Sequence, residues 1–226
     1  SDVYKRQIKV SAHMDLTKKL LPALEKLIEI TDKKANSLKG LVKTGRTHLM
    51  DAMPLDFHQE ISAWTSQLKN SKKTFLFLEK RMLEMPLGGT AVGTGINAHP
   101  RFSKLFAKEL NKLSGGRWKN VPSENFFHEL SAQDTAVQVS GELKNLAIIL
   151  LKISNDLRWM NSGPLAGLSE IELQALQPGS SIMPGKVNPV IPEAVAMVAA
   201  DVIGNDVAIS ICLLYTSDAA DDNAGV

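Results

Sequence analysis

Apolar residues recur every three or four positions over long stretches of the chain, which is the spacing of one face of an α-helix. No stretch of any length alternates between apolar and polar residues, so the sequence predicts no β-strand. The predicted helices cover Ile8–Leu38, Phe57–Met85, His99–Leu113, Asp134–Asn161 and Pro189–Ile211, and Pro122–Leu130 is a connector with its own helical turn.

The helix predicted over Asp134–Asn161 is the most apolar, and it carries apolar residues on most of its faces. Such a helix is buried on all sides, so we expect it at the centre of a bundle. Helices of about 28 residues are about 42 Å long at about 1.5 Å per residue. The predicted fold class is therefore all-α, an elongated bundle of long helices that needs neighbouring subunits to cover its remaining apolar faces.

Three segments between the predicted helices break the helical period, and we expect them to be loops. They are Lys43–Pro54, Pro86–Gly95 with four glycines, and Leu173–Asn188, which is rich in Gly, Ser and Pro. Pro86–Gly95 is not a phosphate-binding loop, because the lysine of that motif is missing and no predicted strand precedes it. We interpret it as a segment of closely packed backbone.

The net charge, the cysteine count and the lengths of the apolar runs argue against several functional classes. The chain has 226 residues, and 26 Lys and Arg against 24 Asp and Glu give a formal net charge of +2. This near-neutral balance argues against a nucleic-acid-binding surface. One cysteine excludes an intramolecular disulfide. We find no signal peptide and no apolar run of the roughly 18 residues needed to span a bilayer. We therefore expect a cytoplasmic protein that binds neither nucleic acid nor membrane.

The two ends of the chain differ from the rest. Residues 1–7 read SDVYKRQ, and the run CLLYTSDAADD begins at Cys212. Both runs resemble translations, from opposite strands, of one transposon-type sequencing adapter. We interpret residues 1–7 and 212–226 as adapter-derived and exclude them from the fold prediction. Residues 8–211 are then expected to be a partial chain, a central helical-bundle domain with N-terminal and C-terminal domains missing.

The segment Gly179–Pro189, GSSIMPGKVNP, carries the strongest candidate chemistry. It offers backbone N–H groups, two hydroxyls, one fixed positive charge and one side-chain amide. These groups suit a carboxylate substrate, and in particular a carboxylate that gains charge during a reaction. By composition alone, an ordinary surface loop with Gly, Ser and Pro at its turns explains the segment as well.

GSSIMPGKVNP resembles the signature of the fumarase/aspartase superfamily over eleven contiguous residues. Other segments resemble class II fumarases at the matching places: Thr44–Leu49 (TGRTHL), Pro86–Gly95, Ser162–Leu168 (SGPLAGL) and Val202–Asp206 (VIGND). The resemblance covers essentially all of residues 8–210 and corresponds to most of the central helical domain of the family. It implies a hydro-lyase that reversibly hydrates fumarate to (S)-malate by anti-addition, through an aci-carboxylate intermediate.

The resemblance implies roles for residues of the serine-containing loop. Ser180 matches the catalytic serine, which would remove the C3 proton of malate as a general base. Ser181, Lys186 and Asn188 match positions that bind the substrate carboxylates, and Val187 is included in this substrate-binding set. A serine hydroxyl is a poor base unless its alkoxide is stabilised. Lys186 and the neighbouring N–H groups are suited to that task.

A second group of residues follows from the same resemblance. His48 matches the other acid/base residue, which would protonate the departing hydroxyl or activate water, and a histidine titrates near neutral pH. Glu193 matches the carboxylate that pairs with this histidine and raises its basicity. Thr47 matches a substrate-binding hydroxyl. The expected catalytic residues are thus Ser180, His48 and Glu193.

Alternative functions stay open within and beyond the superfamily. Aspartate ammonia-lyase, or another fumarate-releasing lyase, is the nearest alternative. His48 and Gly185 favour hydration, because aspartases typically carry glutamine and alanine at these places. The connector Pro122–Leu130 also resembles the fumarase version, although its Ser-Glu-Asn run departs from the commoner pattern and leaves the subgroup open. A non-catalytic helical assembly protein is the other alternative, although such a role needs none of the site residues.

The family also implies partners. We expect a small dicarboxylate substrate and a homotetramer in which each active site is shared between subunits. We expect no cofactor and no metal, because no HxxxH or HExxH spacing is present. No cysteine lies in residues 8–211, which excludes an iron–sulfur cluster held by this segment. Because substrate-binding motifs of other domains would be missing, we expect the 226-residue chain alone to be inactive.

Overall fold

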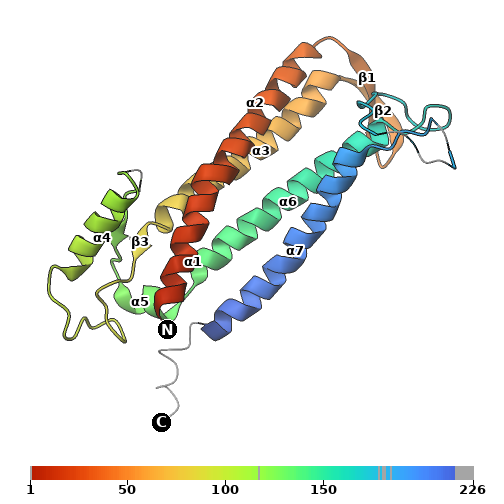
Figure 1. The fold of residues 1–226 in the computed structure, drawn as a ribbon. Coiled ribbons are helices and arrows are strands. Elements are labelled where there is room, and N and C mark those ends of the chain that lie inside the picture. Colours follow the sequence, from red (N-terminus) through yellow and green to blue (C-terminus); the bar gives the residue numbers. More distant parts are fainter. Residues whose placement is uncertain (1, 117, 178, 180–181, 184, 217–226) are drawn as a thin grey trace. The chain divides into compact units, whose positions relative to one another are not determined.

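The computed structural model describes residues 2–116, 118–177, 179, 182–183 and 185–216 (Figure 1). The chain divides into two compact units. The first comprises residues 1–142 and 208–226, and the second comprises residues 143–207. In the described residues, long helices dominate and the strands form two small two-stranded sheets. The predicted all-α class is therefore confirmed, although two parts of the prediction need correction.

The first predicted helix is one continuous helical run with a wider turn inside it. Helix α1 (Asp2–Asp15) leads into a π-helix, η1 (Leu16–Leu20), and then into α2 (Leu21–Ser37). The Leu21 N–H donates to the Leu16 carbonyl, a bond five residues back that widens the turn. Pro22 follows directly and has no N–H to donate. A wider turn leaves room for a proline ring that would clash in a regular helix.

Helix α3 (Phe57–Arg81) runs alongside α2, and the two helices bury a shared apolar core (Figure 1). The most buried apolar residues of α3 are spaced at helical intervals: Ile61, Trp64, Leu68, Phe75 and Leu78. The helix begins at a capping box, in which Asp56 accepts the His58 N–H and Gln59 accepts the Asp56 N–H. It ends at Arg81 rather than at the predicted Met85.

The prediction of a loop at Lys43–Pro54 is wrong, because this segment lies in a β-hairpin. Strand β1 (Val42–Thr47) pairs antiparallel with β2 (Met50–Asp56). The register shifts between Thr44 and Arg46, which is the mark of a β-bulge. Most residues of these strands are exposed, and the less exposed positions of β1 are Lys43, Gly45 and Arg46, so neither strand has the alternation of apolar and polar residues that reveals a strand in sequence.

The remainder of the first unit is built from short elements. Strand β3 (Glu84–Met85) pairs in parallel with β4 (Val121–Pro122). Helix α4 (Phe102–Leu113) starts three residues later than predicted, and α5 (Phe126–Ser131) is the helical turn expected in the connector. The first part of helix α6 (Asp134–Met160) also belongs here, held to α3 by a 2.6 Å hydrogen bond from Ser71 to Glu142.

The second unit consists of the later part of α6, the first part of α7 (Val190–Thr216) and the long connection between them. Lys144 on α6 forms a 2.6 Å ion pair with Asp206 on α7, whose side chain is buried. Leu146, Met160 and Ala199 are buried apolar residues of the unit. This part of the fold positions the long connection between the ends of two helices.

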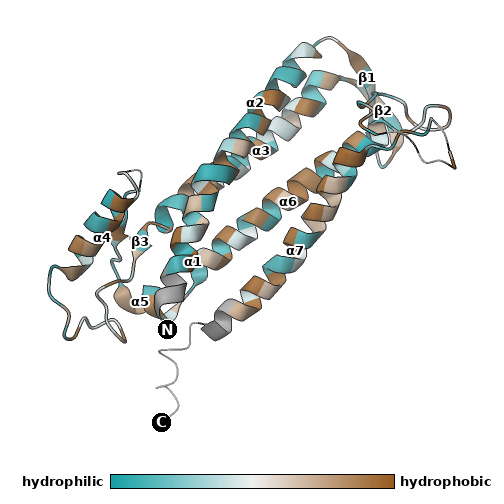
Figure 2. Cartoon of the chain, in the orientation of Figure 1, coloured by the Kyte–Doolittle hydropathy of each residue, from teal (hydrophilic) through white to brown (hydrophobic). Residues whose placement is uncertain are grey.

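Helix α7 contradicts the expectation that the chain has no apolar run long enough to span a bilayer. Val190–Cys212 is long and apolar enough to cross a membrane by length and composition, with a mean hydropathy of 1.7. Glu193, Asp201 and Asp206 interrupt its apolar residues, so the sequence contains no unbroken apolar run of this length here. Figure 2 shows the apolar positions distributed along the helix. A core helix of a soluble protein passes the same test, so this finding alone is weak evidence for a membrane.

Candidate functional site

A large cavity lies in the second unit, between the end of α6 and the beginning of α7. Its volume is about 1010 Å³. Four of the predicted site residues line it together: Lys186, Val187, Asn188 and Glu193. Ser180 and Ser181 lie outside the described residues. The cavity thus brings together one cation, one amide and one carboxylate from the predicted set, drawn from the loop and from the first turn of α7.

Residues at the end of α6 complete the cavity lining. Arg158, Asn161 and Asn155 all face it, and Arg158 donates a 3.1 Å hydrogen bond to Asn155. Sequence reasoning missed them, because a basic residue in the last turn of a helix is explained by the helix dipole alone. Lys186 and Arg158 supply positive charge, and Glu172 and Glu193 supply negative charge, so the charged part of the lining is mixed in sign.

The SGPLAGL segment folds back on the end of α6. Ser162 accepts two hydrogen bonds. The Ser169 N–H donates to the Ser162 carbonyl at 2.8 Å, and the Leu168 N–H donates to the Ser162 hydroxyl at 3.0 Å. A Cβ on Gly167 would lie 2.2 Å from the Ser162 carbonyl carbon, so only glycine fits this close approach. The tight turn explains the second glycine of this motif, Gly167, and shapes one wall of the cavity.

The two arms of the GSSIMPGKVNP loop lie against each other. A Cβ on Gly179 would lie 2.3 Å from the carbonyl oxygen of Lys186, which requires glycine. Gly185 has a φ of +84°, and the Lys186 N–H donates to the Met183 carbonyl at 3.2 Å. Lys186 and Asn188 are exposed, and Glu193 is half-buried. The loop therefore closes at its base and leaves Lys186 accessible to a ligand.

The other two predicted residues, Thr47 and His48, lie at the tip of the β1–β2 hairpin in the first unit. Thr47 pairs with Met50, so His48 and Leu49 form a two-residue turn. Both side chains of this turn are exposed, and the His48 ring makes no hydrogen bond to another described residue. His48 and Glu193 belong to different units, so their predicted pairing stays a prediction.

The glycine of the TGRTH motif, Gly45, is required by the close approach of the opposite strand. It is the buried residue of β1, and a Cβ there would lie 2.4 Å from the Met53 carbonyl oxygen and 2.9 Å from the Leu55 side chain. The opposite strand carries its extra residue at this point, which brings its backbone close to Gly45. The motif therefore holds a glycine for packing rather than for chemistry.

Replacing Gly45 by alanine is expected to open the hairpin. Because the nearest atom is backbone oxygen, the strands must separate, and we expect a loss of about 1–3 kcal/mol in local stability. Faster hydrogen exchange at the amides of β1 and β2, with exchange in α3 unchanged, checks this. Gly141→Ala is the matched control, because its Cβ meets nothing within 4 Å. Unchanged exchange in the Gly45 variant would contradict the steric argument.

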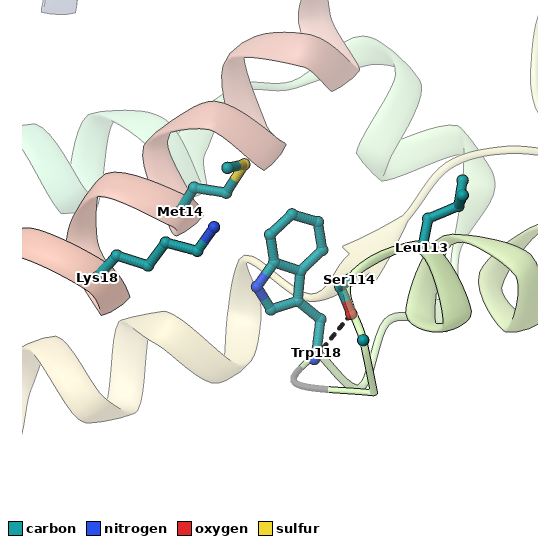
Figure 3. A pocket seen from close by; sticks show the side chains of 6 residues that line it. Met14, Lys18, Leu113, Ser114 and Trp118 are labelled. Carbon is teal, nitrogen blue, oxygen red and sulfur yellow. Dashed lines mark hydrogen bonds between the residues drawn. The ribbon is translucent and has the colours of Figure 1, made fainter.

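A smaller pocket of about 460 Å³ lies in the first unit, beside α1 and the end of α4 (Figure 3). Its walls include Lys18 and Trp118, and the Trp118 backbone N–H donates to the Ser114 hydroxyl at 3.2 Å. Behind Trp118, the edge of the buried His13 ring meets the indole, and His13 bonds Glu79 at 2.9 Å. None of the predicted site residues lines this pocket.

No metal site is evident within the described residues: no three His, Cys, Asp or Glu side chains converge there in a way that could hold an ion. Among the described histidines, His13 and His128 each pair with a single carboxylate, His128 with Asp134 at 3.0 Å.

Several known proteins are similar to this chain. A family described as Lyase matches residues 1–204. Fumarate hydratase class II 2 of Pseudomonas aeruginosa is 54% identical over 211 residues, which are 93% of this chain and 46% of that protein. Fumarate hydratase class II of Xylella fastidiosa (strain Temecula1) is 53% identical over 211 residues, 93% of this chain and 44% of that protein.

A solved structure agrees with these sequence matches. The crystal structure of recombinant class II fumarase from Schistosoma mansoni superimposes with a TM-score of 0.87 at 35% identity. The match covers 94% of this chain and 47% of that chain. The chain therefore spans about half the length of the relatives it matches.

Proposed function

The chain belongs to the lyase family that matches residues 1–204, and from this membership we propose that it takes part in the reversible hydration of fumarate to (S)-malate. Relatives at 53–54% identity that carry the name fumarate hydratase class II support the proposal. The observation that carries it is the cavity in which Lys186, Asn188 and Glu193 meet at the first turn of α7.

The cavity suits a dicarboxylate. Lys186 provides a point charge for one carboxylate, and Arg158 provides a planar cation for a second. Asn188 adds an amide donor, and the first turn of α7 adds the positive end of a helix dipole. A small ligand with two carboxylates would use all of these groups, whereas a neutral ligand would leave the cations unpaired.

In the proposed reaction, Ser180 removes the C3 proton of malate. The electron pair moves into the adjacent carboxylate, which then carries two negative charges as an aci-carboxylate. Lys186 and the loop N–H groups stabilise this charge as it forms, which lowers the barrier instead of binding substrate and transition state equally. Loss of the C2 hydroxyl then gives fumarate, and the reverse sequence hydrates it.

His48 would act on the opposite side of the substrate. It donates a proton to the departing hydroxyl, or accepts one from the attacking water in the reverse direction. Glu193 orients the ring, and Thr47 holds a substrate oxygen. The position of His48 at a hairpin tip supports this role, because a tip can reach into a neighbouring molecule.

We further propose a homotetramer in which each site is built from more than one subunit. Large apolar side chains stand exposed on α7, including Ile191 at 58%, Met197 at 69% and Val198 at 63%. Exposed apolar surface of this extent is typical of an interface. Burial between subunits accounts for the apolar character of α7 without a membrane, and we propose a cytoplasmic location.

The test is fumarate formation by a complete protein that contains this chain, with malate and aspartate supplied separately. Fumarate from malate alone supports hydration. Fumarate from aspartate alone would replace the proposal with an ammonia-lyase activity, and no fumarate from either would favour a non-catalytic assembly protein. The 226-residue chain by itself is the control and is expected to be inactive, because it spans less than half of its relatives.

A further inference from the structure

We propose that the ion pair between Lys43 and Glu60 is a positioning device for His48, which it holds in place by fixing the base of the hairpin. This inference rests on the proposed function of His48 as an acid/base residue. It concerns two side chains that contact no substrate in the proposed reaction. Their effect would pass through the backbone of β1 and β2.

The ion pair joins the hairpin to helix α3. Lys43 lies in β1, and Glu60 lies in the first turn of α3. Their charged atoms are 2.6 Å apart, and the exposed fractions of the two side chains are 8% and 27%. The Lys43 ammonium also lies 5.1 Å from the centre of the Phe57 ring, within reach of a cation–π contact. The pair is therefore largely shielded from water.

The second strand of the hairpin, β2, is fixed to the start of the same helix. One Asp56 carboxylate oxygen accepts the His58 N–H at 2.6 Å, and the other accepts the Gly40 N–H. The Gly40 amide belongs to the turn after α2, so Asp56 ties that turn to the start of α3. Together with the ion pair, these bonds fix both strands of the hairpin to one helix end.

The hairpin tip needs such a frame because its backbone is strained. His48 has a φ of +51° and Leu49 a φ of +64°. A two-residue hairpin turn favours positive φ at both positions, and glycine or asparagine usually occupies them. A residue with a side chain resists this conformation. Leu49 is 76% exposed, so packing at the tip does not compensate for the strain.

A shielded ion pair is not a general source of stability. Taking both charges out of water costs energy, and such pairs are retained in some proteins because they fix one geometry. The contrast with Asp32 and Lys69 is informative. That pair also joins two neighbouring segments of the first unit, α2 and α3, but both side chains are about half exposed. It provides a matched control with similar chemistry and no connection to the hairpin.

The experiment measures kcat and KM of fumarate hydration in the complete protein with Glu60→Gln, Lys43→Met and both changes together. We expect kcat to fall about tenfold in each, with KM changed less than about twofold, because a misplaced catalytic group lowers the rate more than binding. The double variant should lose no more than either single variant. Lys43→Arg should retain most activity, and Asp32→Asn should match the parent protein.

A second arm measures hydrogen exchange in the complete protein. In Glu60→Gln, hydrogen exchange at the amides of β1 should become about tenfold faster, while exchange along the centre of α3 stays unchanged. This arm does not depend on activity. If the complete protein releases no fumarate, the proposed function fails, and the exchange result still decides whether the pair holds the hairpin.

Two results would overturn the inference. One is an active parent protein whose kcat is unchanged by Glu60→Gln. The other is a loss of activity that Lys43→Arg fails to restore and that Asp32→Asn reproduces, because that would indicate general destabilisation and not positioning.

Discussion

In a complete protein that contains this chain, Ser180→Ala is expected to lower kcat for fumarate hydration by about 10²–10⁴-fold. This is the usual contribution of a positioned general base. The change removes one oxygen and leaves the loop glycines in place. Only the proton transfer at C3 is lost, so KM should change little. Steady-state rates with malate and with fumarate check both directions, in which kcat/KM must fall by the same factor because the variant cannot change the equilibrium constant of the reaction.

Ser37→Ala is a suitable control for this variant. The Ser37 hydroxyl is exposed at the end of α2 and donates to the Lys34 carbonyl, 2.8 Å away. Its removal should leave kcat unchanged. Full activity of the Ser180 variant would remove the serine from the mechanism and leave the cavity lined by Lys186 and Arg158 as a binding site only.

Methionine in place of Lys186 is expected to lower kcat by about 10²–10³-fold, the usual effect of removing one donor to a developing anion. Methionine keeps the length of the side chain and removes its charge. Lys186 lines the cavity from the loop, beside Asn188, and its ammonium has no ion pair among the described residues. Its charge is therefore available to a substrate carboxylate.

The division of this effect between kcat and KM decides what Lys186 does. A fall in kcat indicates that the charge acts on the aci-carboxylate. A rise in KM at constant kcat would contradict that role and leave Lys186 as a ground-state binder. Lys19→Met is the control, because the Lys19 side chain is 76% exposed and pairs only locally with Asp15 on the same helical run.

The long helices follow from the sequence because their cores are local in origin. Leu68, Phe75 and Leu78 recur at helical spacing, and the structure buries all three. The contiguous GSSIMPGKVNP motif likewise identified the family, which the match over residues 1–204 confirms. The expectations for residues 1–7 and 212–226 stay predictions, and the structure continues α7 to Thr216, beyond the predicted end at Ile211.

The hairpin could not be predicted from the sequence, because the less exposed positions of β1 are Lys43, Gly45 and Arg46, which create no alternating apolar pattern. The Lys43–Glu60 ion pair and the Asp56 carboxylate join its base to residues 16 or 17 positions away in the chain. Such contacts leave no periodic signal. The same reason explains why Arg158 was missed, since its place in the cavity is set by the return of the chain to the end of α6.

The sequence by itself thus determined the helices, through a period that every turn repeats, and the family, through residues adjacent in the chain. Only the tertiary structure decided that Thr47 and His48 lie on a strained hairpin tip, that Gly45 and Gly179 are required by approaching backbone, and that Lys186 shares a cavity with Arg158. The physical reason is that these features depend on distances between residues far apart in the chain, which hydrophobic periodicity does not encode.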